Sequence, residues 1–462
     1  MVQAAKANDD LRTGFTKELM DLARAKLVRL SNAYSHHTNY TLNAKLAVID
    51  VRVQLDYDLK CEAATDTVAR LVESHMRTAF SIPQYRKYMR SGYPSEAWLA
   101  EAAAQEMVYL HKQRPTFVFD TLDEVLESGI IEPGERGEVI ARVIITHAYD
   151  SAVQKTSPTL DGDPVRFSHG CLLTEFIESL FSGEAAKEVL DSQAHDAGCY
   201  DGNKLILRDR FKKARVRFTH FERLDDQTNL SVMGCVLGMT RCAAFIARRG
   251  EKAIDMVIPI ILDPERLESD LLKTDNMTAM LIQVKNRCDP GSAAANVINV
   301  DKGVPFFSGG SQPYISLVME LGAIPRQLVE QESEMGKGDM SSPKKTKTLD
   351  NPSELTTEQP GSSHYKATRH SCYSIFAYGC SPIVYHMSSL EAKRYGTLLH
   401  KGGFYTEHPR TDEGSLRALH RFMPLASLSA GFEWLTKGDN KIDDGSIDLT
   451  EELMHETVVL GL

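Results

Sequence analysis

The chain has 462 residues and an ordinary globular composition, 42% hydrophobic and 25% charged. Its formal net charge of −10 excludes a polycation that binds nucleic acid or anionic membranes over its whole surface. Any nucleic-acid contact therefore has to come from a local basic patch. No uncharged apolar run reaches the length of a membrane span, and the first residues lack the apolar core of a secretory signal. We therefore expect a cytoplasmic or nuclear protein with no membrane partner.

The eight cysteines are scattered, and none forms a C-x-x-C pair. This pattern predicts free thiols in a reducing compartment and argues against a structural zinc site. The sequence also lacks a G-x-S-x-G nucleophile turn and a G-x-x-x-x-G-K-[ST] phosphate loop. The sequence thus argues against a serine nucleophile and carries no ATPase or kinase signature.

Residues from about 10 to 115 carry apolar side chains at helical spacing, which predicts helices that include residues 63–80 and 96–110. Ser95, which follows Pro94, is the expected cap of the second of these helices. We interpret residues 1–130 as a helical N-terminal region and as a possible surface for a protein partner. The sequence does not determine the oligomeric state.

Residues 131–328 alternate between helical and strand patterns. Helices are expected at 134–149, 172–181, 230–239 and 313–321, and strands at 215–218, 243–246, 253–262 and 277–284. Residues 329–366 have almost no large apolar side chains and are expected to form a flexible linker or loop. Residues 367–462 are expected to add C-terminal strands and helices to the core. The predicted class is α/β (α+β), a mixed sheet flanked by helices.

Two expected strands, at 253–262 and 277–284, are apolar but contain or adjoin polar residues. Burying such polar groups costs free energy unless they have a hydrogen-bond partner or bind a cation. In Ile254-Asp255-Met256, alternation places Asp255 on the face opposite its two neighbours, and an acid in such a strand needs a partner or a cation. In the following strand, Gln283 and Lys285 share one face for the same reason. If the two strands are adjacent, a carboxylate, an amide oxygen and an ammonium group converge.

This combination of groups suits phosphodiester cleavage. A hard cation such as Mg²⁺, or Mn²⁺ in its place, takes oxygen ligands, which Asp255 and Gln283 offer. The metal would polarise the phosphate and lower the pKa of the attacking water. Lys285 would orient that water and stabilise the charge that grows on the phosphate.

An acid on one strand followed by Gln-x-Lys on the next resembles the PD-(D/E)XK phosphodiesterase superfamily, which has the restriction-endonuclease-like fold. The chain also resembles an expanded group of fungal proteins through its segments 93–104, 134–142 and 255–286. The superfamily resemblance covers about residues 134–325. It implies a helix, a strand hairpin, the strand with Gln-x-Lys, a further helix and a last strand. It also implies a Mg²⁺-dependent endonuclease, with DNA preferred over RNA as substrate.

In this superfamily a carboxylate on the first helix usually completes the metal site. The resemblance implies Glu138 for this role, because residues 134–142 open a helix with an acid in its first turn, and Glu178 is the alternative. The chain departs from the commonest pattern because Gln283 stands where many members have Glu.

Other interpretations of the same residues stay open. Asp255 and Lys285 also fit a simple ion pair, and the fold can persist in a catalytically inactive interaction or effector protein. The most basic segment predicts either a nucleic-acid surface, with Phe211 or Phe218 stacking on bases, or the solvated face of an edge strand. Its basic residues, with two more before the Asp255 strand, are Arg208, Arg210, Lys212, Lys213, Arg215, Arg217, Arg248 and Arg249.

Overall fold

The computed structural model describes residues 9–29, 40–82, 89–131, 135–156, 165–194, 205–224, 230–248, 253–264, 272–286, 298–300, 306–307, 311–322 and 370–400. By internal contacts the chain divides into two units, Met1–Leu399 and His400–Leu462. The helices and strands below belong to the first unit, apart from the last residue of α13. The stretch 329–366, expected to be a flexible linker, lies outside the described residues.

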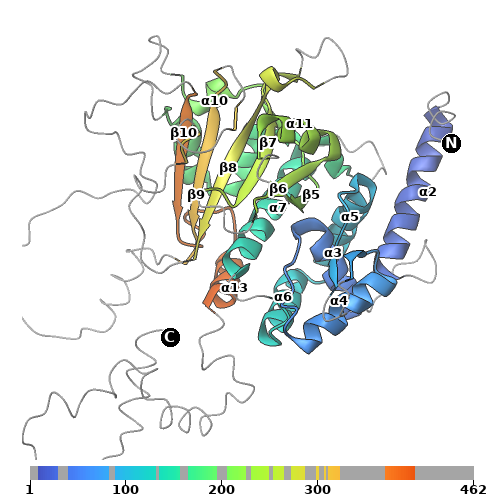
Figure 1. Ribbon diagram of the computed structural model, residues 1–462. Helices are drawn as coiled ribbons and strands as arrows, with labels where there is room; N and C mark the ends of the chain where they lie inside the picture. The colour runs from blue at the N-terminus through green and yellow to red at the C-terminus, as the bar shows by residue number, and fades with distance from the viewer. Residues whose placement is uncertain are drawn as a thin grey trace, which may run out of the picture. The chain divides into compact units, whose positions relative to one another are not determined.

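An eight-stranded mixed sheet is the centre of the described structure (Figure 1). Its main path has the strand order β10-β9-β8-β7-β4-β3. Off this path, β6 pairs with β7 and with β5. The strands are β3 (Cys171–Leu172), β4 (Arg215–Val216), β5 (His220–Arg223), β6 (Ala243–Ile246), β7 (Met256–Ile261), β8 (Met277–Lys285), β9 (Tyr314–Glu320) and β10 (Cys372–Tyr378).

The strand directions bring several strand ends to one edge of the sheet. β8, β9 and β10 are mutually parallel, and β5 is parallel to β6. β7 runs antiparallel to both β6 and β8. The carboxyl ends of β5, β6, β8, β9 and β10 therefore meet at the edge where β7 begins. We call this the carboxyl edge, and in α/β proteins such an edge is where ligands commonly bind.

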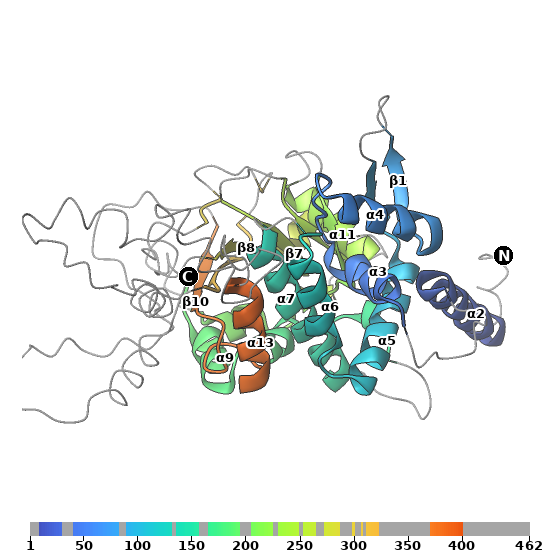
Figure 2. The same ribbon diagram turned by 90° about the horizontal axis from the view of Figure 1, so that it is seen from below.

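Helices cover both faces of the sheet. The α7 side is packed with Met256, Ile258, Met280 and Ile282, whereas Val257, Ala279 and Leu281 pack toward α11. Figure 2 shows α6, α7 and α13 side by side. The helices are α2 (Asp9–Val28), α3 (Leu42–Val53), α4 (Glu62–Ser74), α5 (Ala97–Gln113), α6 (Phe117–Glu127), α7 (Arg136–Thr156), α8 (Leu173–Leu180), α9 (Gly183–Asp191), α10 (Leu207–Arg210), α11 (Val232–Arg241) and α13 (Ser389–His400). The predicted α/β class is thus confirmed.

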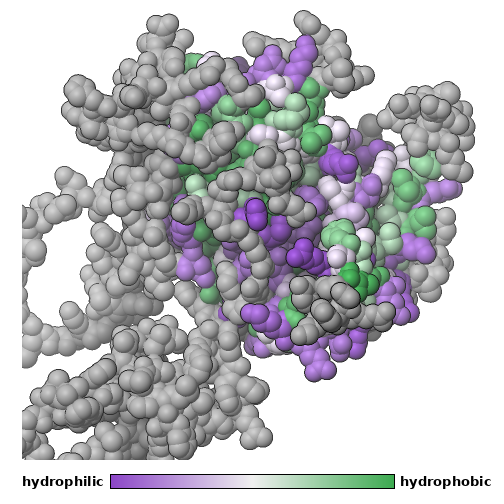
Figure 3. Space-filling model, viewed as in Figure 1, coloured by the Kyte–Doolittle hydropathy of each residue, from purple (hydrophilic) through white to green (hydrophobic). Residues whose placement is uncertain are grey.

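The surface of α11 that faces away from the sheet keeps two large apolar side chains exposed, Met233 at 57% and Leu237 at 56%. In Figure 3, apolar surface gathers in the area where Figure 1 places α11. Among the described helices, none is both long enough and apolar enough to cross a membrane.

The N-terminal region packs on the same core as the sheet, since α3 contacts α5, α7 and β5. α3 is buried on nearly all sides, and even Asp50 and Arg52 in it are fully buried. Each has a partner: Arg52 pairs with Asp150 of α7, and Asp50 pairs with Arg77. Burying these charges is tolerable only because they are paired and hydrogen-bonded.

This region is not helical throughout. The helix expected over residues 63–80 ends at Ser74, and a separate two-stranded sheet follows, made of β1 (Thr78–Ser81) and β2 (Arg90–Gly92). The prediction of a continuous helix to residue 80 is therefore wrong. We call β1 and β2 together the β1–β2 hairpin.

Two other local predictions are also wrong. Residues 313–321 form strand β9 rather than a helix, because a strand that lies between β8 and β10 with both faces covered is apolar on both sides. Ser95 does not cap α5. Glu96 does so, by accepting a hydrogen bond from the Trp98 backbone NH, and Ser95 instead hydrogen-bonds His220.

Candidate functional site at the carboxyl edge

Asp255 lies at the carboxyl edge, directly before β7. Its backbone NH donates to the Ile282 carbonyl at 2.8 Å, and its Oδ2 accepts a hydrogen bond from the Val284 NH at 2.6 Å. Ile254 packs on the α11 side and Met256 on the α7 side, so the expectation that both lie opposite Asp255 is wrong. The strand begins only at Met256, and the alternation does not extend back through Asp255.

Gln283 and Lys285 lie on the adjacent strand. The last register pair of β7 and β8 is Met256 with Ile282, which places Asp255 opposite Gln283 at the next step. Ile282 and Val284 pack on the α7 side, so Gln283 and Lys285 share the other face. Gln283 is 6% exposed, and Lys285 is half-buried at the strand end. The adjacency of the two strands, on which the sequence argument depended, is therefore present.

Glu138 reaches the same edge from the first turn of α7. The preceding residue, Gly137, packs so closely on β8 that a Cβ added to it would lie 2.9 Å from the Asn286 Cβ and 3.7 Å from a Val284 methyl. A glycine thus lets the N-terminus of α7 approach the end of β8. Glu178, the alternative carboxylate, instead lies on α8 and pairs with Arg208 at 3.6 Å.

The electrostatics of Glu138 and Asp255 reflect their proximity. Burial raises the pKa of Glu138, and the negative charge of Asp255 raises it further, while Arg142 lowers it. Burial likewise raises the pKa of Asp255, against the lowering effects of the Val284 hydrogen bond and of Lys285. The negative charge of Glu135 also raises the pKa of Asp255. Carboxylates gathered in this way form a site that a cation would stabilise.

Sequence reasoning missed two arginines and two carboxylates beside these residues. Arg142 of α7 is fully buried, and its guanidinium lies 3.6 Å from Glu138 and 3.8 Å from Asp56. Arg223, at the end of β5, is paired with Asp56 and lies 4.0 Å from Glu135. We call these four residues, with Glu138, Asp255 and Lys285, the edge cluster. No sequence signal connects Asp56 and Arg223 with the other residues of the edge cluster, because they come from separate segments of the chain.

The edge cluster holds four carboxylates and three cations. Burial, followed by the charges of Asp56 and Glu138, raises the pKa of Glu135 to about 7, although Arg142 and Arg223 oppose this. Burial lowers the pKa of Arg142, and the nearby carboxylates counteract this effect. Its Nη2 donates to the Gln54 carbonyl at 3.0 Å, whereas its Nε has no hydrogen-bond partner among the described residues.

The donors at this edge suit a hard cation chemically, since carboxylate and amide oxygens are what Mg²⁺ binds. In the described part of the chain, no three His, Cys, Asp or Glu residues are grouped closely enough to hold a metal. Magnesium sites usually use only one or two carboxylates and keep several waters. Glu138 and Asp255 would be the carboxylates of such a site, whereas the Gln283 side chain is on the face of β8 turned away from α7.

The basic segment proposed for nucleic-acid contact lies away from the edge cluster. β4 pairs with the far end of β7, where Arg215 lies opposite Ile261, about 20 Å along the strand from Asp255. Phe211 and Phe218 are each 1% exposed, so the idea that they stack on bases is wrong. β4 lies between β3 and β7, so the edge-strand interpretation is also wrong.

Several basic side chains of this segment have protein partners. Arg208 pairs with Glu178 and Asp191, Lys213 pairs with Asp263, and Arg215 and Arg217 donate to the Gly170 and Ser168 carbonyls. Arg210 and Lys212 are exposed. Of the two arginines after β6, Arg248 is exposed and Arg249 lies outside the described residues.

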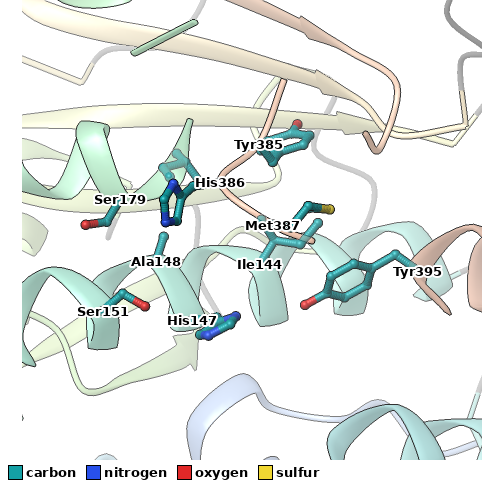
Figure 4. A pocket seen from close by; sticks show the side chains of 10 residues that line it. Ile144, His147, Ala148, Ser151, Ser179, Tyr385, His386, Met387 and Tyr395 are labelled. Atoms are coloured by element: carbon teal, nitrogen blue, oxygen red, sulfur yellow. The ribbon is translucent and has the colours of Figure 1, made fainter. Parts of the chain in front are cut away.

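A small pocket elsewhere is formed by α7, the end of α8, α13 and the segment before α13. Figure 4 shows His147 of α7 and His386 among its lining residues, together with Tyr395 of α13. The ring of His147 is 5.8 Å from that of His111 on α5. None of the edge-cluster residues lines this pocket.

A family model described as a domain of unknown function, DUF8736, matches residues 41–158. The matched segment runs from α3 to α7 and so includes Asp56, Glu138 and Arg142, but not Asp255, Gln283 or Lys285. No curated protein and no solved structure matches the chain.

Proposed function

We propose that the chain is a Mg²⁺- or Mn²⁺-dependent phosphodiesterase that cleaves nucleic acid, DNA in preference to RNA, in the cytoplasm or nucleus. The observation that carries this proposal is the meeting of Glu138 and Asp255 at the carboxyl edge, with Lys285 beside Asp255. These residues come from α7, from the start of β7 and from the end of β8. The strand order β6-β7-β8-β9, with β9 parallel to β8, is compatible with the resemblance to the PD-(D/E)XK superfamily.

Glu138 and Asp255 would hold the metal, whereas Gln283, the third ligand expected from the sequence, is on the face of β8 turned away from α7. When bound, the metal supplies Lewis-acid polarisation of the scissile phosphate and a more acidic attacking water. The protein's own part is positioning. The Val284 NH fixes one carboxylate oxygen of Asp255, and Gly137 permits the close approach of α7 that brings in Glu138.

Lys285 is the residue proposed to touch the reacting phosphate. Its ammonium group lies at the end of β8, half-buried and beside Asp255. A cation at this place donates hydrogen bonds to a phosphate oxygen and stabilises the negative charge that develops there. Arg142 acts as a positioning residue, because it is paired with Glu138 behind the site.

The two helix carboxylates provide a matched test. Glu138→Gln and Glu178→Gln are the same chemical change on α7 and on α8, and only the first is at the edge cluster. We expect Glu138→Gln to lower metal-dependent cleavage of labelled DNA by about a hundredfold, and Glu178→Gln to leave it unchanged. Equal effects of the two substitutions would contradict the assignment of Glu138. Lys285→Met is expected to abolish cleavage while metal binding persists.

A second candidate is a protein that keeps this fold without catalysis and binds a partner protein through its helical N-terminal region. The observation in its favour is that arginines occupy the neighbourhood of the carboxylates: Arg142 pairs with Glu138 and Asp56, and Arg223 pairs with Asp56. Such pairs compensate the carboxylate charge without a metal. Measuring Mn²⁺ affinity distinguishes the two candidates. The nuclease is expected to bind Mn²⁺ and to lose affinity in Asp255→Asn, whereas the interaction protein is expected to show no such loss.

A further inference from the structure

The β1–β2 hairpin is separate from the main sheet and exposes large apolar side chains. All four residues of β1 are exposed, with Phe80 at 61%, and Ile82 just beyond it is 62% exposed. Phe80 lies at an irregularity in the pairing of the two strands, between Ala79 opposite Ser91 and Ser81 opposite Arg90. Figure 2 shows β1 standing out beyond α4.

The hairpin is firmly mounted although its strands are exposed. Arg77, at its base, is paired with the buried Asp50 and donates to the Ser91 carbonyl at 2.9 Å and to the Ser91 hydroxyl at 3.0 Å. The same guanidinium lies over the ring of Tyr57 at 4.8 Å and that of Tyr93 at 5.7 Å. The base is therefore rigid, and the exposed strands project from a fixed point.

This mount is continuous with the edge cluster. The Gln54 side chain donates to the Tyr93 carbonyl, at the end of the hairpin, at 3.4 Å, and the Gln54 carbonyl accepts from Arg142. Asp56, two residues further on, is paired with Arg142 and Arg223. One short segment after α3 thus holds both the hairpin and the back of the candidate site.

The charge of the hairpin contrasts with that of the whole chain. Residues 75–95 contain no Asp or Glu, in a protein with a net charge of −10. Of their basic residues, Arg77 is buried and paired with Asp50, and Arg86 and Lys87 lie outside the described residues. Arg90, the first residue of β2, is exposed. Phe80 lies against Gly92 of the opposite strand, where an added Cβ would lie 2.9 Å from its ring, so the hairpin backbone supports the aromatic side chain.

We propose that the β1–β2 hairpin is a nucleic-acid-binding arm, in which Arg90 contacts a backbone phosphate and Phe80 stacks on a base. An exposed arginine and an exposed aromatic ring on one hairpin, in a stretch of chain without acids, form a combination that binds nucleic acid. The inference rests on the proposed nuclease function for its choice of ligand. It deepens that function by assigning substrate binding to a surface adjoining the edge cluster, rather than to the basic segment around β4.

Binding to fluorescein-labelled DNA, measured by anisotropy in EDTA so that no cleavage occurs, tests the arm separately from catalysis. Single-stranded and duplex probes of one sequence are used. Arg90→Glu is expected to weaken binding by about tenfold and to reduce the salt dependence by about one phosphate contact. Phe80→Ala is expected to weaken single-strand binding by about fivefold or more through lost stacking. Both side chains are exposed, so thermal melting should match wild type.

Arg210→Glu is the matched control, because Arg210 is an exposed arginine on α10, in the basic segment beyond the far end of β7. It should bind DNA as the wild type does. If Arg210→Glu and Arg90→Glu lose the same amount of DNA affinity, the effect is one of overall charge, and the proposed nucleic-acid-binding arm is wrong. The proposal is also wrong if both hairpin variants bind DNA as the wild type does. It is equally wrong if the variants lose binding to anionic lipid vesicles while their DNA binding is unchanged. If wild type and Asp255→Asn bind DNA equally but neither cleaves it, the proposed function fails while the arm stands.

Discussion

The close approach of α7 to β8 leads to a prediction for Gly137→Ala. The added Cβ would lie 2.9 Å from the Asn286 Cβ, well inside ordinary van der Waals contact. Because the obstacle is a Cβ held by strand-end backbone, α7 has to shift. Overpacking of this kind costs about 1–3 kcal/mol, and the gain in helix propensity from Gly to Ala returns at most about 1 kcal/mol. The expected net loss is about 1–2 kcal/mol.

Asn286→Gly removes the atom that causes the clash, so the double variant should recover most of the loss. Urea unfolding of the wild type, the two single variants and the double variant gives the coupling energy, which we expect to be about 1–2 kcal/mol. DNA cleavage should follow the same order, since the shift moves Glu138 away from Asp255. Wild-type stability for Gly137→Ala, or a double variant no better than the sum of the single variants, would refute this packing argument.

Two further predictions concern buried ionisable groups. His220 is 3% exposed, and burial, followed by the nearby Arg52 and Arg241, lowers its pKa to about 3. Since the unfolded state takes up a proton near pH 6.5, this group costs stability as the pH falls below that value, about 2 kcal/mol by about pH 5. Thermal melting of His220→Gln across this range should show a shallower acid loss than wild type, and parallel curves would contradict the argument. Arg142→Met should cost about 3–5 kcal/mol near neutral pH, because it leaves Glu138 and Asp56 without their buried partner. The pKa of Glu138 is raised in the folded state, and such a carboxyl group gains stability as it protonates. This deficit should therefore shrink as the pH falls, and a pH-independent deficit would count against the proposed pairing.

Long periodic elements were predictable from the sequence. α7, α8 and α11 lie close to the residues expected, as do β6, β7 and β8. β9 was mistaken for a helix because a short run that is apolar on both sides has no distinguishing period. α3 lies inside the region expected to be helical but was not singled out as a helix, since its buried Asp50 and Arg52 make it look neither amphipathic nor uniformly apolar. Their partners lie elsewhere in the chain, at Arg77 and Asp150.

The candidate site was only partly accessible from sequence. Asp255 and Lys285 are close in the chain and lie on paired strands, so strand geometry was enough to associate them. Arg223 and Asp56 reach the same edge from distant segments, and ion pairs between distant segments leave no local pattern. The basic segment around Arg215 was wrongly expected to lie near Asp255 because the two are close in sequence. In the structure they are separated by the length of β7. The acid-free run over residues 75–95 was the available signal for the hairpin.

The most direct test of the account is cleavage of labelled DNA by the purified full chain in Mg²⁺ or Mn²⁺, compared with Asp255→Asn. Asp191→Asn, the same change at an exposed acid that pairs with Arg208, is the control. We predict metal-dependent cleavage by the wild type and by Asp191→Asn, and its loss in Asp255→Asn with folding and DNA binding retained. Cleavage that survives in Asp255→Asn at the wild-type rate would contradict the assignment of the edge cluster as a nuclease site.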